Sequence, residues 1–217
     1  MINTIILSIF YIILFAFAEF LYHYLKFKGE FTRKIVHIGS GIITLLFPLW
    51  LDNHWFVLIL CSNFFVLLLV SLKFNFLKSV NAIERFSVGS LLYPCAVYMC
   101  YCVYEFEGQK LYFFYLPVLS LALCDPLAEF FGKKYPYKKY KIGQSFKSIG
   151  GSFAFMISCF LLSFGILSYC NHSIILTLFF SFIIAFFTSL AEGVSGKGTD
   201  NITIPLMVII CLKVLDV

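Results

Sequence analysis

The sequence has few charged residues, and this shortage excludes a water-soluble fold. Only 12% of its 217 residues are charged, whereas 61% are hydrophobic and the mean hydropathy is +0.95. A soluble domain carries about 25% charged residues, because polar groups must cover its surface. Since 20% of the residues are aromatic, the chain is also neither disordered nor fibrous. The composition predicts an integral membrane protein, folded as a single domain over residues 1–217.

Signals for other classes of protein are also missing. No Lys or Arg precedes Lys26, so the basic region of a secretory signal peptide is lacking and we expect the first apolar run to remain as a helix. The eight cysteines form no CxxC pair, and no histidine lies at ligand spacing, which argues against a zinc site or a disulfide framework. The net charge of +5 is interpreted as an orientation signal, not as a sign of nucleic-acid binding.

Long apolar runs predict an all-α polytopic membrane protein with seven or eight transmembrane helices. Seven runs are clear: Ile2–Leu25, Ile35–Leu51, Trp55–Leu72, Val88–Tyr104, Leu111–Cys124, Ile149–Tyr169 and Ser173–Ala191. Most approach the length that crosses a hydrocarbon core of about 30 Å. An eighth run, Ile202–Leu215, is short and contains Pro205, so it either spans or dips in and returns.

The basic residues are distributed unevenly between the loops. Of the sixteen Lys and Arg, fourteen follow the first, third, fifth and seventh runs, whereas Lys110 alone lies on the other side and Lys213 lies in the last run. Loops rich in Lys and Arg face the cytoplasm in membrane proteins. We therefore expect the odd-numbered loops to be cytoplasmic and the N-terminus to lie on the opposite side of the membrane.

Polar residues at the start of the second run form one stripe. At about 100° per residue, Arg33, His37, Ser40 and Thr44 share a helix face, with Lys34 beside it. Snorkelling anchors explain the two basic residues, but not the histidine and hydroxyls that continue the stripe inward. Charged groups at membrane depth cost about 2.5–3.5 kcal/mol each and commonly mark functional sites.

Acidic residues follow at two places on the same expected side. Asp125 and Glu129 end the fifth run and share a face with Gly132, while Glu192, Asp200 and Asn201 lie between the seventh and eighth runs. Neighbouring carboxylates repel each other unless a cation lies between them, and oxygen ligands suit Mg²⁺. Salt-bridged caps and ordinary turn chemistry are the simpler interpretations of these residues.

A glycine- and lysine-rich loop over 132–152 precedes the sixth run. Lys133, Lys147 and Ser148 lie in it, and glycines directly before a helix make a natural phosphate cradle, because free backbone N–H groups point out of that end. The loop lacks the spacing of a P-loop. Together, the basic stripe, the loop and the carboxylates predict a site for a magnesium-bound nucleotide or phosphorylated substrate, with an apolar second substrate arriving from the bilayer.

These regions, in this order, resemble the CTP-dependent polyprenol kinase family, which includes dolichol, phytol and farnesol kinases. The resemblance covers about residues 33–205, including the segment Glu84–Ser87 with Gly89, Ser90, Tyr93 and Pro94. Its motifs are RK-x-x-H-x-x-x-G at Arg33, Lys34, His37 and Gly41, D-x-x-A-x-x-x-G at Asp125, Ala128 and Gly132, KS at Lys147 and Ser148, and E…DN-x-x-x-P at Glu192, Asp200, Asn201 and Pro205.

The resemblance implies transfer of the γ-phosphoryl group of CTP to the hydroxyl of a membrane-dissolved alcohol, with Mg²⁺ as cofactor. It implies that the metal is held by Asp125, Asp200, Glu129 and Glu192, with Asn201 adding an oxygen. The implied phosphate-binding residues are Arg33, Lys34, Gly132, Lys133, Lys147 and Ser148. The base that accepts the alcohol proton is left open between Asp125, Asp200 and His37.

Two departures from the family pattern and two rival functions accompany this interpretation. Gly150 stands where the family usually has Glu, and a Tyr135–Pro136 turn replaces a second glycine. A phosphatidate cytidylyltransferase is the rival enzyme, although such proteins show Asp-Arg where this chain has Asp200-Asn201. A non-catalytic transporter or scaffold is the third hypothesis. A transporter should place polar residues at the membrane midplane, whereas the polar groups of this sequence are expected at one side of the membrane.

Overall fold

The computed structural model describes residues 1–81, 88–143, 145–170 and 173–217, and these are mostly helical. The apolar runs of the sequence are helical, as predicted, although Ile35–Leu51 is divided between α2 and the short helix α3. The elements in chain order are α1 (Ile2–His23), α2 (Gly29–Thr44), α3 (Phe47–Trp50), α4 (His54–Phe74), α5 (Lys78–Asn81), α6 (Gly89–Phe106), α7 (Tyr112–Leu119), the π-helical turn η1 (Ser120–Cys124), α8 (Asp125–Lys134), β1 (Lys139–Ile142), β2 (Ser145–Ser148), α9 (Ile149–Leu167), α10 (Ile174–Val194) and α11 (Asp200–Val214).

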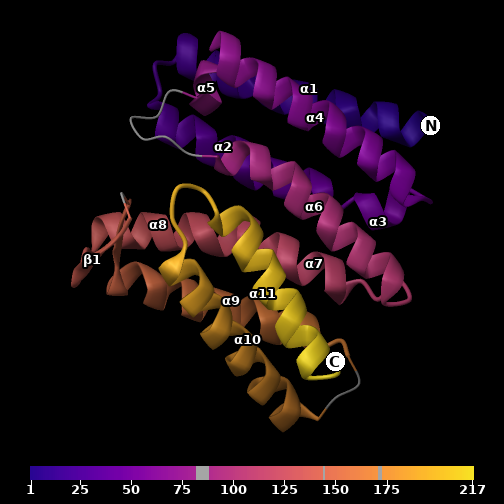
Figure 1. The fold of residues 1–217 in the computed structure, drawn as a ribbon, viewed down its shortest axis with the longest axis vertical. Coiled ribbons are helices and arrows are strands. Elements are labelled where there is room, and N and C mark those ends of the chain that lie inside the picture. The colour runs from indigo at the N-terminus through magenta and orange to yellow at the C-terminus, as the bar shows by residue number, and fades with distance from the viewer. Residues whose placement is uncertain (82–87, 144, 171–172) are drawn as a thin grey trace.

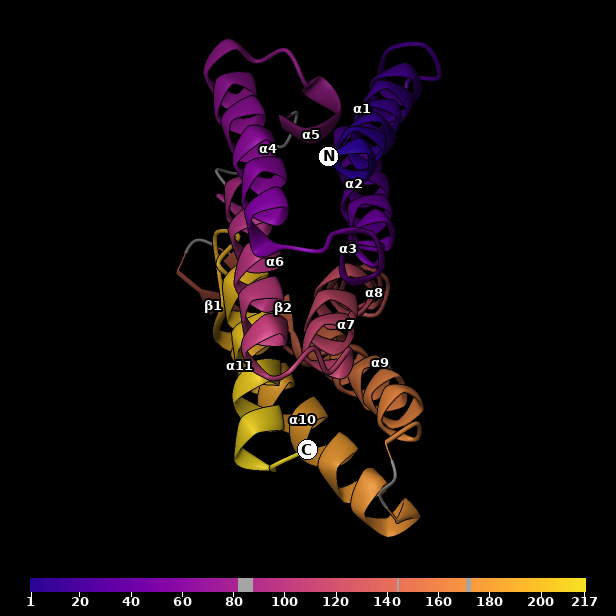
Figure 2. The same ribbon diagram turned by 90° about the vertical axis from the view of Figure 1, so that its right-hand side faces the viewer.

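The helices form two groups with separate apolar cores (Figure 1). The first core lies mainly among α1–α6 and includes Leu7, Phe47 and Cys100, all fully buried, and it reaches Phe114 of α7 and Ile209 of α11. The second lies among α7–α11 and includes Phe155 and Ile204. In Figure 2, α1 stands beside α2 and α4 beside α6, with α7, α9, α10 and α11 below them. Polar side chains are therefore left to gather where the two groups meet.

Five helical segments are long and apolar enough to cross a membrane. They are Ile2–His23, His54–Phe74, Tyr112–Lys134, Ile149–Leu167 and Ile174–Val194. With 16 and 15 residues, α2 and α11 are shorter than the roughly 20 residues that span a bilayer. The structure thus confirms a nearly all-α fold with several candidate spans, but it does not confirm the count of seven or eight.

The fifth helix is longer than the sequence predicts. The prediction ends it at Asp125–Glu129, but α7, η1 and α8 follow one another without a break to Lys134. Asp125 therefore lies within a continuous helical segment. The expected loop after Gly132 is shorter for the same reason, and much of it forms the antiparallel hairpin β1–β2, in which Ile142 pairs with Ser145. Gly143 supplies the positive φ of +56° that this tight turn requires.

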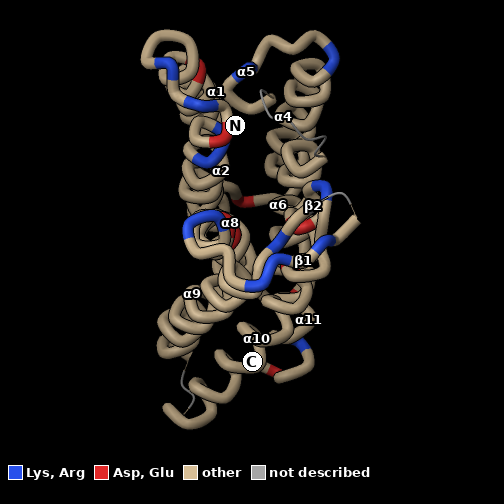
Figure 3. Tube along the Cα trace, turned by 90° about the vertical axis from the view of Figure 1, so that its left-hand side faces the viewer, with Lys and Arg blue, Asp and Glu red and all other residues tan. Residues whose placement is uncertain are grey.

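The loops that carry most basic residues lie at one end of the molecule. The α1–α2 connection, the β1–β2 hairpin and the α10–α11 connection lie toward the left of Figure 1, and Figure 3, viewed from that side, shows Lys and Arg spread over the end that faces the viewer. The α2–α4 and α6–α7 connections lie away from it. This arrangement agrees with the alternation of basic loops along the sequence.

Candidate active site

A cavity of about 610 Å³ lies between the two helix groups at the basic end. All four polar regions of the sequence contribute to its wall, although they are up to 168 residues apart. From the predicted site residues it is lined by Arg33, Lys34 and His37 of α2, Asp125, Glu129, Gly132 and Lys133 of α8, Lys147 and Ser148 of β2, Glu192 of α10, and Asp200 and Asn201 of α11. The fold thus brings every predicted site residue to one place.

The stripe on α2 faces this cavity as its spacing predicts. Arg33, His37 and Ser40 line it, whereas Thr44 lies beyond them and its hydroxyl is 2.7 Å from that of Tyr11. Close packing of α2 on η1 fixes the position of the stripe. A Cβ atom at Gly41 would approach the Cβ of Ala122 to 2.3 Å, so only glycine permits this contact.

A hydrogen bond to the π-helical turn fixes the tautomer of the neutral His37 ring. Its Nε2 lies 3.0 Å from the carbonyl oxygen of Leu121 in η1. A carbonyl can only accept, so Nε2 donates and the Nδ1 of the neutral imidazole keeps its lone pair. Turns of this kind leave carbonyls without their usual helical partner and are frequent at functional sites. The His37 ring also packs edge-on against Tyr93, with centroids 5.0 Å apart.

Among the carboxylates that line the cavity, Asp125 and Asp200 form no ion pair with any residue that the structure describes. Asp200 accepts hydrogen bonds from the backbone N–H and the side-chain amide of Asn201, at 3.1 and 3.2 Å. The two carboxylates are near enough to repel each other. Repulsion of this kind destabilises a site until a cation or a basic group enters it.

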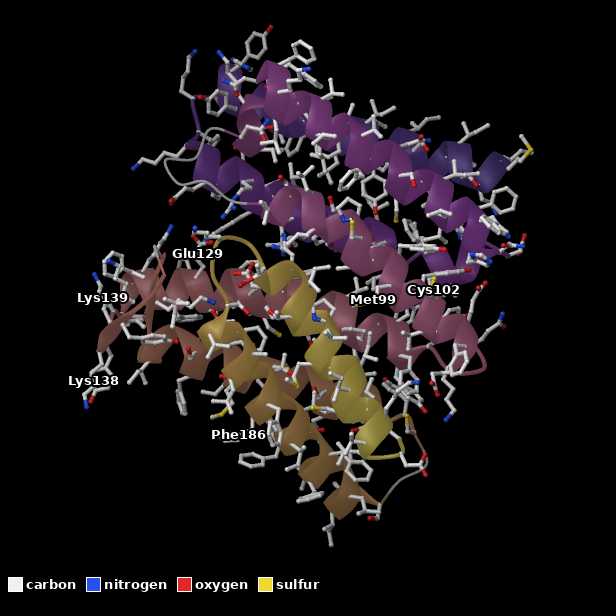
Figure 4. The ribbon with its side chains drawn as sticks, viewed as in Figure 1. Met99, Cys102, Glu129, Lys138, Lys139 and Phe186 are labelled. Carbon is white, nitrogen blue, oxygen red and sulfur yellow. The ribbon has the colours of Figure 1, made fainter. Side chains whose placement is uncertain are left out.

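Glu129 is neutralised by lysines. Lys133 lies 2.7 Å from one of its carboxylate oxygens, and Lys34 lies 3.4 Å from the other. Lys133 also bonds Glu30 at 2.7 Å, and this hydrogen bond lowers the pKa of the Glu30 carboxyl below its ordinary value. Figure 4 shows Glu129 on the side of α8 that faces α2. Among the predicted phosphate-binding residues, Arg33 forms no ion pair within the described part of the chain.

Glu192 is the second neutralised carboxylate, and it is buried. Lys147 lies 2.5 Å from one oxygen of Glu192 and also bonds its backbone carbonyl. The hydroxyl of Ser152 donates to the other oxygen at 3.3 Å. The Lys147 and Glu192 side chains are 14% and 7% exposed, so each depends on the other for its charge to be tolerated.

The phosphate-type loop ends in a capped helix. The Ser148 hydroxyl accepts from the backbone N–H of Gly151, so it caps the N-terminus of α9. Gly132 of α8 and Gly151 of α9 allow the two helices to touch: a Cβ at Gly151 would lie 2.9 Å from the carbonyl oxygen of Ala128. The cap uses a residue that the sequence assigns to phosphate binding, so its hydroxyl already has a partner.

The two departures from the family pattern contact each other. A Cβ atom at Gly150 would lie 2.7 Å from the backbone carbonyl oxygen of Tyr135. The Tyr135–Pro136 turn thus occupies the space into which a side chain at position 150 would project. A glutamate could not enter there without a backbone shift, so the two differences form one local rearrangement.

The acidic residues suit a cation that keeps part of its hydration shell. The described residues hold no group of three or more His, Cys, Asp or Glu placed to bind a metal. Magnesium is commonly held by one or two carboxylates, with waters and substrate phosphates completing six oxygens. Asp125 and Asp200 fit this requirement because neither is ion-paired among the described residues, whereas Glu129 and Glu192 would first have to leave their lysines.

The sequence analysis missed a residue that holds the wall of the site together, and one predicted motif segment lies outside the described residues. Tyr140 of β1 bonds Ser152 at 3.0 Å and the carbonyl of Gly193 at 3.2 Å, which ties the hairpin to α9 and α10. The alternation of Lys and apolar residues before Gly143 is a signal for that hairpin. The predicted motif segment Glu84–Ser87 lies outside the described residues.

Comparison with known proteins identifies one curated relative. The chain is 28% identical over 190 residues to a phytol kinase from Synechocystis sp. (strain ATCC 27184 / PCC 6803 / Kazusa). The aligned region covers 87% of this chain and 81% of the relative. No family model matches the chain, and no solved structure matches it. The similarity to a phytol kinase along most of both chains confirms the resemblance to the polyprenol kinase family that the ordered motifs indicate.

Proposed function

We propose that this protein is a CTP-dependent kinase that transfers the γ-phosphoryl group to the hydroxyl of a membrane lipid alcohol, such as phytol, farnesol or a longer polyprenol. The observation that carries the proposal is the convergence of four separate polar regions on one cavity. The similarity to a phytol kinase supports the reaction class. The nucleotide, the cation and the individual acceptor belong to the proposal.

The cavity wall carries both positive and negative side chains without ion-pair partners in the described part of the chain, which supports a ligand with both negative and positive groups. Arg33 on α2 and the two carboxylates of Asp125 and Asp200 line the same cavity, yet they do not pair with one another. A nucleotide triphosphate with its magnesium ion would satisfy them together. Phosphoryl transfer depends mainly on such positioning and charge neutralisation, with little covalent chemistry from the protein.

Each group has a role in this proposal. Asp125 and Asp200 would hold Mg²⁺, with Asn201 beside them and Glu129 and Glu192 as second-choice ligands. The ion neutralises charge on the β- and γ-phosphates when it is bound. Arg33, Lys34 and Lys133 would contact phosphate oxygens from one side, and Lys147 with the backbone around Gly132 and Ser148 from the other.

The acceptor hydroxyl would enter from the α2 side. Its oxygen attacks the γ-phosphorus, the bond to the β-phosphate oxygen breaks, and CDP leaves. The hydroxyl proton passes to a base, for which Asp125, Asp200 and the Nδ1 of His37 are the candidates. The fixed ring of His37 suits either accepting this proton or orienting the hydroxyl.

Product analysis tests the function. Purified protein with γ-labelled CTP, magnesium and a panel of lipid alcohols should yield CDP and a labelled lipid monophosphate. ATP and GTP in place of CTP test the base preference. Release of pyrophosphate with formation of a CDP-lipid from phosphatidic acid, and no labelled lipid monophosphate, would assign the chain to the cytidylyltransferases instead.

We propose a cytoplasmic position for the cavity, which the basic loops around it support. Single cysteines at positions 53, 108, 139 and 197, in a background without native cysteines, test this sidedness. An impermeant thiol reagent added outside should label positions 53 and 108 and spare the other two. Labelling of position 139 from outside would reverse the orientation.

A further inference from the structure

A second, apolar pocket continues from the cavity into the first helix group. It has a volume of about 40 Å³ and lies between α1, α2, α4 and α6. Four residues line both spaces: Phe15, Ser40, Leu68 and Tyr93. The two spaces are therefore neighbours that share a wall, and the pocket extends the polar cavity toward the interior of this helix group.

The pocket is lined mainly by apolar side chains, and the Tyr93 hydroxyl at the wall shared with the polar cavity is its buried polar atom without a partner among the described residues. No charged residue lines it. The Tyr11 hydroxyl is already bonded to the hydroxyl of Thr44 at 2.7 Å and donates to the carbonyl oxygen of Ser40 at 3.3 Å. Leu60, Cys61 and Val97 supply much of the remaining surface. A pocket with so few polar groups favours a hydrocarbon occupant, with the Tyr93 hydroxyl at its polar end.

Aromatic rings close the pocket between α1 and α4. The ring of Phe64 lies 4.5 Å from that of Tyr11 and 6.0 Å from that of Phe15, measured between centroids. Phe64 is the α4 side of this contact and is only partly buried. A chain that enters from the cavity would therefore meet the Phe64 ring before it could pass between α1 and α4.

We infer that this pocket receives the hydrocarbon chain of the acceptor alcohol and that Phe64 limits the length of chain that fits. The inference rests on the proposed function and adds a specificity-determining residue to it. The small volume accommodates a short stretch of hydrocarbon, since a single water needs about 10–15 Å³ of such space. A longer chain must displace the Phe64 ring.

Two substitutions of opposite effect test the inference. Phe64→Ala removes the obstructing ring and should raise kcat/KM for a long polyprenol relative to farnesol by about tenfold, the scale on which apolar pockets discriminate chain size. Cys61→Leu partly fills the pocket and should lower kcat/KM for every alcohol by about tenfold. The KM for CTP should stay unchanged in both variants, because neither residue lines the polar cavity.

Phe17→Ala is the matched control, since Phe17 also lies on an aromatic-rich helix face but is 51% exposed on the outside of α1. It should leave the ratio between acceptors unchanged. If Phe64→Ala turns over alcohols with the wild-type ratio, the inference fails while the kinase function stands. If the wild-type protein phosphorylates no alcohol in the panel, the proposed function fails first and the inference falls with it.

Discussion

The two pairs of carboxylates around the cavity differ in one respect: Glu129 and Glu192 have lysine partners, whereas Asp125 and Asp200 have none among the described residues. Asp125 and Glu129 are only one helical turn apart on α8, so the difference does not come from their distance to the basic end. The difference depends on which carboxylate oxygens a lysine side chain contacts. A carboxylate that already has a partner helps to stabilise the folded protein, whereas an unpaired one destabilises it until a cationic ligand binds.

This comparison separates two kinds of acidic residue that look alike in sequence. The paired residues connect elements: Glu129 links α8 to α2 through Lys34, and Glu192 links α10 to β2 through Lys147. The unpaired residues lie on α8 and α11 without such a link. We therefore expect substitutions at the two pairs to affect different properties.

The largest effect should come from the unpaired pair. Asp125→Asn and Asp200→Asn should each lower kcat by about a hundredfold or more, because each removes a charge that stabilises the metal-bound transition state. The folded state should be as stable as the wild type or more stable, because the repulsion between the two carboxylates is relieved. Phosphotransfer assays and thermal unfolding in detergent measure both quantities.

Asp52→Asn, at an exposed position away from the cavity, is the control and should change neither quantity. A variant at Asp125 or Asp200 that kept near-normal turnover at limiting magnesium would remove that residue from the metal site. The unpaired carboxylates would then have no greater role in catalysis than the paired ones.

Breaking the buried pair should have a smaller effect on catalysis and a larger one on stability. Lys147→Met leaves the Glu192 charge buried and unpaired, which should cost about 3–5 kcal/mol of unfolding free energy. It should also lower kcat/KM by about thirtyfold, the equivalent of about 2 kcal/mol for a lost charge-assisted hydrogen bond to phosphate. The double variant Lys147→Met with Glu192→Gln should recover stability but keep the thirtyfold loss of kcat/KM.

Lys138→Ala, in the same basic segment but exposed, controls for a diffuse positive patch. It should behave as the wild type in both assays. Equal losses of activity at positions 138 and 147 would show that the segment acts only through its overall charge. Recovery of activity together with stability in the double variant would make the role of Lys147 structural.

The smallest effect should come from Glu129→Gln. Its partner Lys133 is 52% exposed and keeps its bond to Glu30, so the expected loss of stability is about 1 kcal/mol or less. Activity should fall less than tenfold, because the charge of Glu129 is already neutralised. Measuring kcat over a range of magnesium concentrations tests whether Glu129 binds the metal. A loss as large as that of Asp125→Asn would add Glu129 to the metal ligands.

Much of the fold and the composition of the candidate site could be predicted from the sequence. Apolar runs mark the helices, because burial in lipid demands them, and the stripe from Arg33 to Ser40 follows from helical periodicity alone. The convergence of distant regions was indicated by the alternation of basic loops, which brings them to the same side. These signals are local, or depend only on counting charges.

The remaining features depend on tertiary contacts. Which of two glutamates meets a lysine depends on long-range packing, as in the bond from Lys147 to Glu192, 45 residues apart. The apolar pocket arises where four helices fail to fill space, and no single segment encodes it. The contact between Gly150 and the Tyr135 carbonyl links two differences that look independent in the sequence.

The π-helical turn before Asp125 changes the phase of the helix that carries it. An ordinary helix advances about 100° per residue, and a π turn accommodates one extra residue in its circuit. Everything after η1 is therefore rotated by about 100° from where α7 alone would have placed it. The face of α8 that bears Asp125, Glu129 and Gly132 meets the cavity with this rotation in place. The five residues Ser120–Cys124 thus set the rotation of α8 about its axis. Deleting one of these five residues would turn the α8 side chains away from the cavity without removing any of them.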